Sequence, residues 1–271
     1  MRRFKVGLLL VLFIAGLCGT AWAGDTLADA KAKGVLIAGV KNDTKPFGNL
    51  DKATNEIVGY DIDFCKAIAG KIGVKLELKP VTSANRMELL KSGAIDMIAA
   101  TMTKNEERAK IIDFSYMYFF TGQKFLVKKG TASKLADLEG KKIGTVKGST
   151  SEKNLRKALP TAVVVTFDNY PLAFTELTQG SLEAVTTDEP ILAALKSSVK
   201  DKDQYEIPNI QISDEPYGLG MRKGDKNFVD FVNATLLEME TSGDAAKIYD
   251  KWFGVTSEAP MARSFTITPQ K

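Results

Sequence analysis

The hydrophobic side chains of the chain recur with two spacings, that of a β-strand and that of an α-helix. The apolar run 35–40 predicts a buried strand, and apolar side chains recur in residues 61–72 at the spacing of an amphipathic helix. Residues 74–81 alternate between apolar and charged positions, as a half-buried strand does. A short helix ending at Gly93 follows, and 95–100 predicts another buried strand. Such alternation of strands and helices is typical of an α/β fold with largely parallel sheets.

A second strand–helix series follows residue 130, and two helices close the chain. The predicted strands of this series are 142–146, 163–167 and 182–186, and its predicted helices are 150–158, 172–178, 226–241 and 244–252. Two series with a closing helical pair predict two lobes joined by two crossings, near residues 125–130 and 215–222. The expected division is a first lobe from 24–127 and 218–256, a second lobe from 128–217, and a peripheral tail from 257–271.

The N-terminal residues have the pattern of an export signal. Three basic side chains precede an apolar run of 12 residues, from 6 to 17, and Ala21-Trp22-Ala23 provides a small-x-small cleavage site. A bilayer-spanning helix needs roughly 20 apolar residues. We therefore expect a signal peptide over 1–23, cleavage near Ala23/Gly24 and a periplasmic protein. An uncleaved anchor is the alternative, and a lipoprotein is disfavoured because Leu17 precedes Cys18.

Composition excludes several classes of function. The chain has 37 basic and 33 acidic side chains, but three of the basic ones lie in residues 1–23, so the excess nearly disappears on cleavage. The charge therefore gives no support for nucleic-acid binding, which needs a basic face. Histidine is absent, which excludes Ser-His-Asp and Cys-His enzymes and histidine-ligated zinc. After cleavage Cys65 is the one remaining cysteine, so no disulfide forms within the chain.

Several motifs in order resemble one family. Gly59-Tyr60-Asp61-Ile62-Asp63-Phe64 opens the helix of residues 61–72, and the segments 83–96 and 101–108 form a helix–Gly–x–x–Asp–strand–Thr–x–Thr–x4–Arg run. From about Leu36 to Phe253 the chain resembles the family 3 extracellular solute-binding proteins, the polar amino-acid receptors of ABC importers. The resemblance implies a two-lobe periplasmic-binding-protein type II fold with the ligand cleft between the lobes. It also implies no enzymatic step, no cofactor, a free amino acid as ligand and a membrane permease as partner. We expect a monomer.

Two segments offer binding chemistry at the starts of helices. Arg108 comes about one turn into a helix that follows a buried strand, where open α/β sheets place their ligands, and a bidentate arginine there suits a carboxylate. Residues 147–152, Lys-Gly-Ser-Thr-Ser-Glu, also lie between a strand and a helix, where hydroxyls and free N–H groups bind anions. This segment is not a phosphate-binding Walker loop, because its lysine precedes its glycine.

The resemblance implies roles for several candidate residues. Arg108 would bind the ligand's α-carboxylate, Ser149 and Thr150 would close over it from the second lobe, and Asp188 would accept the α-ammonium group. Lys41 and Arg86 together resemble the receptors for glutamate and aspartate, since a dicarboxylate needs a second cationic cluster. The full set of predicted ligand-binding residues is Lys41, Ser83, Arg86, Thr101, Thr103, Arg108, Ser149, Thr150, Tyr170 and Asp188.

Several candidates also have a purely structural interpretation. Thr103 with Glu106 forms a capping-box pattern, and Ser149 and Asp188 are good N-cap residues. Tyr170 suits an ordinary loop aromatic, and Lys41 suits a solvated surface lysine. Three functional alternatives stay open as well: a receptor for glutamine or another polar amino acid, a dehydratase-like enzyme on the same scaffold, and a sensory module that presents its amino acid to a signalling receptor.

Overall fold

The computed structural model describes residues 24–269, so the predicted signal peptide lies outside the described residues. The helices are α1 Thr26–Lys33, α2 Tyr60–Ile72, α3 Arg86–Lys91, α4 Glu106–Ala109, α5 Thr150–Ala158, α6 Tyr170–Thr178, α7 Glu189–Ser197, α8 Lys226–Thr241 and α9 Asp244–Phe253, with 3-10 turns η1 Leu135–Leu138 and η2 Lys202–Gln204.

The strands continue the same alternation with the helices. They are β1 Val35–Val40, β2 Asp43–Thr44, β3 Gly48–Asp51, β4 Glu56–Val58, β5 Lys75–Pro80, β6 Met97–Ala99, β7 Ile112–Lys128, β8 Lys142–Val146, β9 Val163–Phe167, β10 Ala184–Asp188, β11 Tyr205–Glu206 and β12 Ser213–Arg222. Most predicted elements agree with these to within two residues. Strands β7, β11 and β12, the β2–β4 hairpins and helix α1 were not predicted from the sequence.

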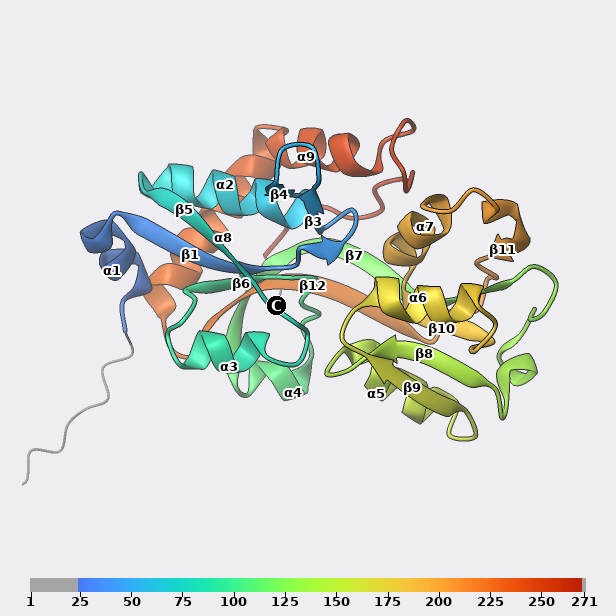
Figure 1. Ribbon diagram of the computed structural model, residues 1–271. Coiled ribbons are helices and arrows are strands. Elements are labelled where there is room, and N and C mark those ends of the chain that lie inside the picture. The colour runs from blue at the N-terminus through green and yellow to red at the C-terminus, as the bar shows by residue number, and fades with distance from the viewer. Residues whose placement is uncertain (1–23, 270–271) are drawn as a thin grey trace, which may run out of the picture.

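Two long strands, β7 and β12, connect the two halves of the molecule (Figure 1). The main sheet follows the order β5-β1-β6-β12-β7-β10-β8-β9, and β11 pairs with β7. We call the half with β1, β5, β6, α1–α4, α8 and α9 lobe 1, and the half with β8–β10 and α5–α7 lobe 2. The β7–β12 pairing runs antiparallel from Gln123↔Ser213 to Ile112↔Arg222, with register shifts around Gly218.

The expectation of largely parallel sheets is therefore only partly right. Strands β1, β5 and β6 are parallel to one another, as are β8, β9 and β10. The central β7 and β12 are antiparallel to each other and to their neighbours, which makes the sheet mixed. The reason is topological, because the chain leaves lobe 1 along one strand and returns along the strand beside it.

Helices cover both faces of the sheet in each lobe (Figure 1). In lobe 1, one apolar core lies beneath α2, α8 and α9, and a second lies beneath α3 and α4 on the opposite face. The first core contains a cluster of buried aromatic rings in which Phe47 packs edge-on against Phe119, 4.9 Å between ring centroids. Tyr217 of β12 joins the same cluster, 5.3 Å from Phe47. This packing fixes the position of the crossing strands beneath the helices of lobe 1.

The described part of the C-terminal tail is not peripheral, contrary to expectation. The Ala259 and Ile267 side chains are each 1% exposed, and the Phe265 ring packs on Phe119 of β7 at 5.6 Å. The Arg263 guanidinium forms a half-buried ion pair with Glu240 of α8. The segment lacks periodicity because it has no regular structure, so the pattern of its residues could not indicate that single side chains are buried in lobe 1.

Candidate functional site

Arg108 and Thr103 flank the start of α4. Asn105 is the N-cap of this helix, and its side-chain oxygen accepts a hydrogen bond from the Arg108 backbone N–H at 2.9 Å. The capping-box interpretation of Thr103 is therefore wrong, since the helix begins two residues later than that motif requires. One terminal nitrogen of the Arg108 guanidinium donates to the Thr103 carbonyl at 2.9 Å. This bond directs the Arg108 side chain along the end of the sheet. The side chain is only 8% exposed.

A bend after β6 positions Arg86. Thr101 has a left-handed backbone conformation, with φ of 49°, and the buried Asp61 carboxylate accepts its backbone N–H at 3.0 Å. Asp61 also accepts the Tyr118 hydroxyl, at 2.6 Å. The bend turns the carbonyls of Ala100 and Thr101 toward Arg86, whose guanidinium donates to both. Asp61 is thus a structural residue that shapes the Thr101 segment.

Lys41 follows β1 and is buried beside Ser83. Its side chain is 2% exposed, which excludes the interpretation as a solvated surface lysine. The Lys41 ammonium group donates to the Ser83 hydroxyl at 3.1 Å. Electrostatic interaction with Arg86 is the second cause, after burial, of the lowered pKa of Lys41. The structure therefore brings Lys41, Ser83 and Arg86 together in lobe 1.

In lobe 2, Ser149 and Thr150 open α5. Ser149 is the N-cap, because its hydroxyl accepts the Glu152 backbone N–H at 3.1 Å, and the same hydroxyl donates to the Val146 carbonyl at 2.6 Å. The structural interpretation of Ser149 is therefore confirmed. The Thr150 hydroxyl lies 3.3 Å from the Thr103 hydroxyl of lobe 1. The two lobes meet at this pair of predicted site residues.

Asp188 and Tyr170 lie at the lobe 2 side of the same region. Asp188 ends β10 and is the N-cap of α7 by position, but its side chain makes no capping hydrogen bond. Instead its Oδ2 accepts the Tyr217 hydroxyl, and its Oδ1 is buried with no hydrogen-bond partner among the described residues. Tyr170 is the first residue of α6 and is 4% exposed, so the loop-aromatic interpretation is wrong.

The site contains three buried cations that lack direct ion pairs. Within residues 24–269, no carboxylate oxygen lies within 4 Å of the charged nitrogens of Lys41, Arg86 or Arg108, although 12 such ion pairs occur elsewhere, for example at Lys153 and Glu107. The Arg86 Nε–H is also buried without a partner. Unpaired buried charge is costly, so this arrangement favours an anionic ligand group that would compensate it.

The pKa values of these groups reflect the same lack of compensation. Burial first, and the nearby Arg108 second, lower the pKa of Arg86 to about 9. Burial also lowers the pKa of Arg108. On the acidic side, burial first and the charge of Glu215 second raise the pKa of Asp188 well above its ordinary value. Carboxylate groups beside the cations and an ammonium group beside Asp188 would each favour the charged forms.

Two further side chains of this region, Glu215 and Tyr217, both on β12, were not predicted from the sequence. Glu215 is 1% exposed and accepts hydrogen bonds from Thr103 and Thr150, at 2.5 and 2.9 Å. Tyr217 binds Asp188 as described above. Glu215 lies within the crossing expected near residues 215–222, but that segment was not predicted as a strand, so nothing indicated that its side chain points inward.

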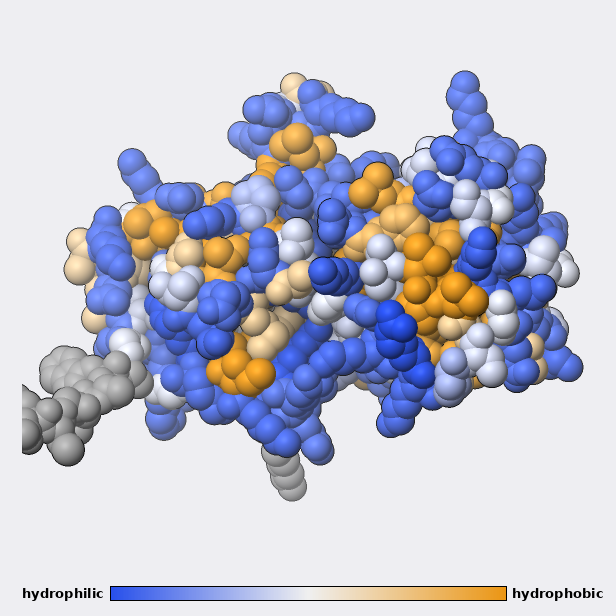
Figure 2. All heavy atoms as spheres, turned by 60° about the horizontal axis from the view of Figure 1, so that its bottom comes forward, coloured by the Kyte–Doolittle hydropathy of each residue, from blue (hydrophilic) through white to orange (hydrophobic). Residues whose placement is uncertain are grey.

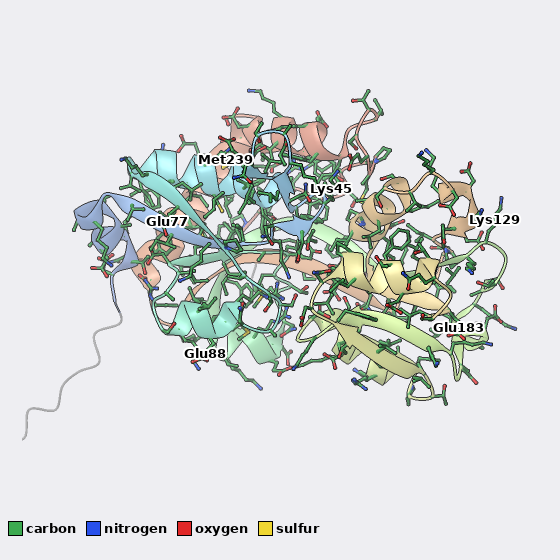
Figure 3. All side chains as sticks on the ribbon, in the orientation of Figure 1. Lys45, Glu77, Glu88, Lys129, Glu183 and Met239 are labelled. Atoms are coloured by element: carbon green, nitrogen blue, oxygen red, sulfur yellow. The ribbon has the colours of Figure 1, made fainter. Side chains whose placement is uncertain are left out.

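One cavity lies between the lobes, next to Tyr170. It has a volume of about 310 Å³ and is lined by Asp43, Thr44 and Lys45 of lobe 1 and by apolar side chains of α6 and α7, including Phe174. The face seen in Figure 2 is mostly hydrophilic, with an apolar region on its lobe 2 half. Figure 3 shows Lys45 on the part of lobe 1 that faces α7, whereas Glu88 lies at the outer surface of α3.

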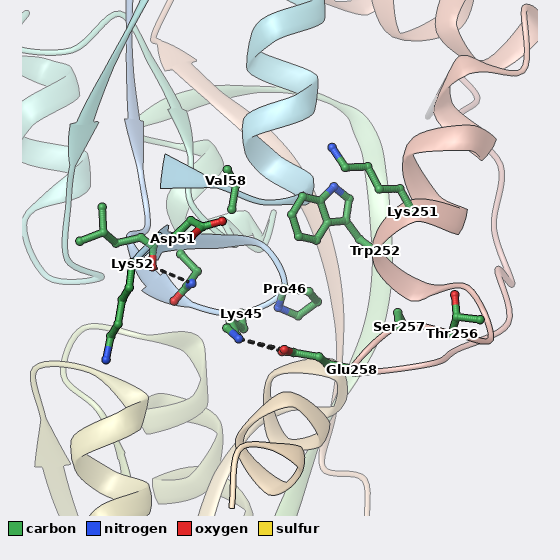
Figure 4. Close-up of a pocket in the computed structure, with 12 residues that line it drawn as sticks. Lys45, Pro46, Asp51, Lys52, Val58, Lys251, Trp252, Thr256, Ser257 and Glu258 are labelled. Carbon is green, nitrogen blue, oxygen red and sulfur yellow. Dashed lines mark hydrogen bonds and ion pairs between the residues drawn. The ribbon is translucent and has the colours of Figure 1, made fainter. Parts of the chain in front are cut away.

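A larger cavity, of about 770 Å³, lies away from the predicted site residues and is drawn in Figure 4. The β2–β3 hairpin lines it on one side, and Trp252 with tail residues 256–258 lines the other. Its best-defined polar contact is the ion pair between Lys45 and Glu258, at 3.0 Å, which is already satisfied within the chain. The candidate ligand site is therefore the buried polar region between the lobes.

Residues 24–269 lack two kinds of feature. No group of three or more acidic, histidine or cysteine side chains is arranged to hold a metal ion there. None of the helices in this range is both long enough and apolar enough to span a bilayer.

Two lobes joined by paired strands, with buried charged groups from both lobes gathered at their junction, define a two-lobed solute-binding protein. The family model of the bacterial extracellular solute-binding proteins, family 3, matches residues 36–255. The chain belongs to this family. Its members are extracellular or periplasmic binding proteins, and the relatives found are transport-associated binding proteins, not enzymes.

Individual relatives cover most of the chain. The glutamine-binding protein GlnH of a Bacillus subtilis ABC transporter is 43% identical over 84% of this chain and 84% of its own length. The glutamate/aspartate import solute-binding protein of Salmonella typhimurium is 32% identical over 93% of this chain and 89% of its own length. Among solved structures, an ancestral arginine-binding protein bound to arginine superimposes with a TM-score of 0.77 at 42% identity, over 82% of this chain and 99% of the other. These matches confirm the type II periplasmic-binding-protein fold.

Proposed function

We propose that this protein is the amino-acid-binding component of an ABC importer and that it binds an acidic amino acid, glutamate or aspartate. The observation that carries the proposal is the pair Lys41 and Arg86. Both are buried, they lie beside each other, and neither has a carboxylate within 4 Å in the described range. A distal carboxylate on the ligand would compensate both charges, whereas an amide would leave Lys41 uncompensated.

The other candidate residues contact the ligand from both lobes. Arg108 binds the α-carboxylate, with Ser149 and Thr150 closing over it from lobe 2, and Asp188 accepts the α-ammonium group. Thr101, Thr103, Ser83 and Tyr170 complete the enclosure of the ligand, in agreement with their burial at the junction.

Closure between the lobes follows from this division. Ligand binds lobe 1 first, formed by about 24–127 and 218–256. Lobe 2, about 128–217, then rotates in, because contacts from both lobes to one ligand stabilise the closed state over the open one. The closed protein delivers the amino acid to a membrane permease. The protein is a monomer, exported to the periplasm by a signal peptide over residues 1–23 that is cleaved near Gly24.

A second candidate ligand is glutamine. It is favoured by two relatives of 43% and 42% identity that are named glutamine-binding proteins. The same fold and the same α-carboxylate and α-ammonium contacts serve either ligand, so the two candidates differ only at the distal group. Lys41, which would contact the distal group, is therefore the residue that distinguishes an acidic amino acid from glutamine.

Calorimetric titration of the mature protein, stripped of ligand by unfolding and refolding, tests the proposal. We expect micromolar or tighter binding of glutamate or aspartate, with glutamine at least about tenfold weaker, a difference of about 1.4 kcal/mol. Preference for glutamine or arginine would reject the acidic specificity and keep the binding role. No binding of any amino acid would reject the receptor function itself.

Replacing Lys41 with methionine tests the distal contact. We expect Lys41→Met to weaken glutamate binding about 10- to 100-fold and glutamine binding by much less, because the methionine retains the apolar stem and loses the charge. Lys91→Met, at an exposed lysine of α3 in the same lobe, is the matched control. An equal loss for both ligands would show that Lys41 does not select the distal group.

The pH dependence of glutamate affinity provides a further check. Burial, followed by the charge of Arg86, lowers the pKa of Lys41 to about 8 in the free protein. A bound carboxylate would favour the charged form, so glutamate affinity should fall as the pH rises through about 8. The stability of the ligand-free protein depends on pH with the opposite sign. Between about pH 8 and pH 10.5 Lys41 binds more protons in the unfolded chain than in the folded protein, so this group makes the free energy of unfolding rise with pH.

The measurement is a series of titrations from about pH 7 to about pH 9.5 on the unmodified protein and on Lys41→Met. Ionisation of the ligand affects both proteins equally, so the ratio of their affinities isolates Lys41. A ratio that does not change with pH would contradict the assignment.

A further inference from the structure

A second buried carboxylate, Glu215, has no part in the binding scheme described so far. It lies on β12, one of the two strands that connect the lobes, and its neighbour Asp214 is exposed while Glu215 itself is 1% exposed. Burying a carboxylate requires hydrogen-bond donors around it. The identity of the donors around Glu215 indicates what this side chain does.

Four donors surround Glu215, and they come from both lobes. Its Oε2 accepts the hydroxyls of Thr103, at 2.5 Å, and Thr150, at 2.9 Å. Its Oε1 accepts the Ser213 hydroxyl, at 2.6 Å, and the Asn154 amide, at 2.8 Å. Two donors on each oxygen fill the lone-pair positions of an ionised carboxylate. Thr103 belongs to lobe 1, whereas Thr150 and Asn154 belong to α5 of lobe 2.

This arrangement fixes the direction of the two threonine protons. A hydroxyl has one proton, so Thr103 and Thr150 that donate to Glu215 have only lone pairs left for another partner. Their oxygens are 3.3 Å apart, and the charge of Glu215 also acts on Asp188, whose Oδ1 has no partner among the described residues. Apart from the Arg108 guanidinium, which Glu215 also attracts, this part of the region consists of acceptors and suits a group that only donates, such as an ammonium.

We propose that Glu215 is a positioning residue, which orients the Thr103 and Thr150 hydroxyls as acceptors for the ligand's α-ammonium group and links the two lobes while it does so. The inference rests on the proposed function, because it requires an amino acid as ligand. It reassigns Thr150 from the carboxylate of the ligand to its ammonium group.

Glu215→Gln tests this role with little change in shape. The amide has one acceptor oxygen and one NH2 group, so a threonine facing the NH2 must rotate its proton toward the ligand. We expect the affinity for the amino acid to fall about tenfold or more. The affinity for the same molecule without its α-ammonium group, which is glutarate in the case of glutamate, should change by less than about twofold. Calorimetric competition at millimolar glutarate measures the second affinity.

Glu88→Gln, at the exposed glutamate of α3, is the matched control and should change neither affinity. A merely structural Glu215 would weaken both ligands equally when replaced, and this outcome would overturn the inference. If the unmodified protein bound no amino acid, the proposed function would fail. If it bound one and Glu215→Gln bound it equally well, only this inference would fail.

Thr103→Val gives a second readout, which remains available if Glu215→Gln does not fold, and it completes a double-mutant cycle with Glu215→Gln where both fold. Valine keeps the shape of threonine and removes the hydroxyl, so Thr103→Val alone should discriminate against the ammonium-bearing ligand in the same way. If Glu215 acts through Thr103, the double variant should bind about as weakly as the weaker single variant. Additive losses, or equal losses for both ligands in Thr103→Val, would contradict the proposal.

Discussion

Arg108→Met is expected to weaken amino-acid binding by at least about 100-fold, the largest effect of any single side chain in the site. Removing one partner of a buried, hydrogen-bonded charge pair costs about 2–5 kcal/mol, because the other charge stays buried without a partner. Arg108→Lys should fall between this variant and the unmodified protein, since lysine keeps the charge but cannot bind a carboxylate with two parallel hydrogen bonds. Titration calorimetry measures both affinities.

The stability of the ligand-free protein separates this binding defect from misfolding. The Arg108 charge repels Arg86 but is stabilised by Glu215 and Asp188, so the two effects offset and we expect ligand-free Arg108→Met to unfold at a similar temperature. Arg156→Met, at an exposed arginine of α5, is the control for loss of a surface arginine. If the affinity of Arg108→Met were within about threefold of that of the unmodified protein, Arg108 would not be a ligand-binding residue.

Gly148→Ala is expected to weaken binding about as strongly, for a steric reason. Gly148 of lobe 2 lies against Ala84 of lobe 1, where an added Cβ would come within 2.8 Å of the Ala84 Cα. Backbone atoms cannot give way as a flexible side chain can, so the lobes would have to stay further apart. The Thr103–Thr150 contact could then no longer form as it does here, and we expect an affinity loss of about 100-fold.

A matched control separates the steric clash from backbone strain, because Gly148 also has a left-handed φ of 75°. Gly140 is in the same lobe with φ of 68° and has no atom within 4 Å of an added Cβ. Gly140→Ala therefore carries a similar strain without the clash and should bind normally. Small-angle scattering with saturating ligand should show a larger radius of gyration for Gly148→Ala alone. Equal behaviour of the two variants would reject the steric explanation.

The sequence predicted regular elements well where one face of the element is buried. Helix α5, for example, begins and ends as expected at Thr150 and Ala158, and β8 and β9 agree to the residue. Strand β7 escaped prediction because it runs through both lobes and packs against different partners along its 17 residues. The side chains of β7 therefore do not follow one alternating apolar–polar pattern along the whole strand.

The candidate residues were predicted from the family resemblance together with their place beside strands and helix starts. Lys41 follows a strand and Arg108 lies one turn into a helix that follows a strand, and both are buried. Glu215 was missed because its burial depends on donors supplied by Thr103 and Asn154, far away in the sequence. Tyr170 was placed outside its helix because the helix was expected to start at Leu172, after Pro171, although proline is favoured in the first turn of a helix and can follow another helical residue.

The antiparallel pairing of β7 and β12 has a consequence for engineering. Because Gln123 and Ser213 are paired across neighbouring strands, the chain enters and leaves lobe 2 at points about 5 Å apart. All the intervening residues form an insertion with adjacent ends, and the segments on either side belong to lobe 1. Such a segment can be exchanged for that of a relative, or its ends joined by a short turn, without displacing either terminus. Recombining the two halves of different receptors should therefore yield hybrid binding sites.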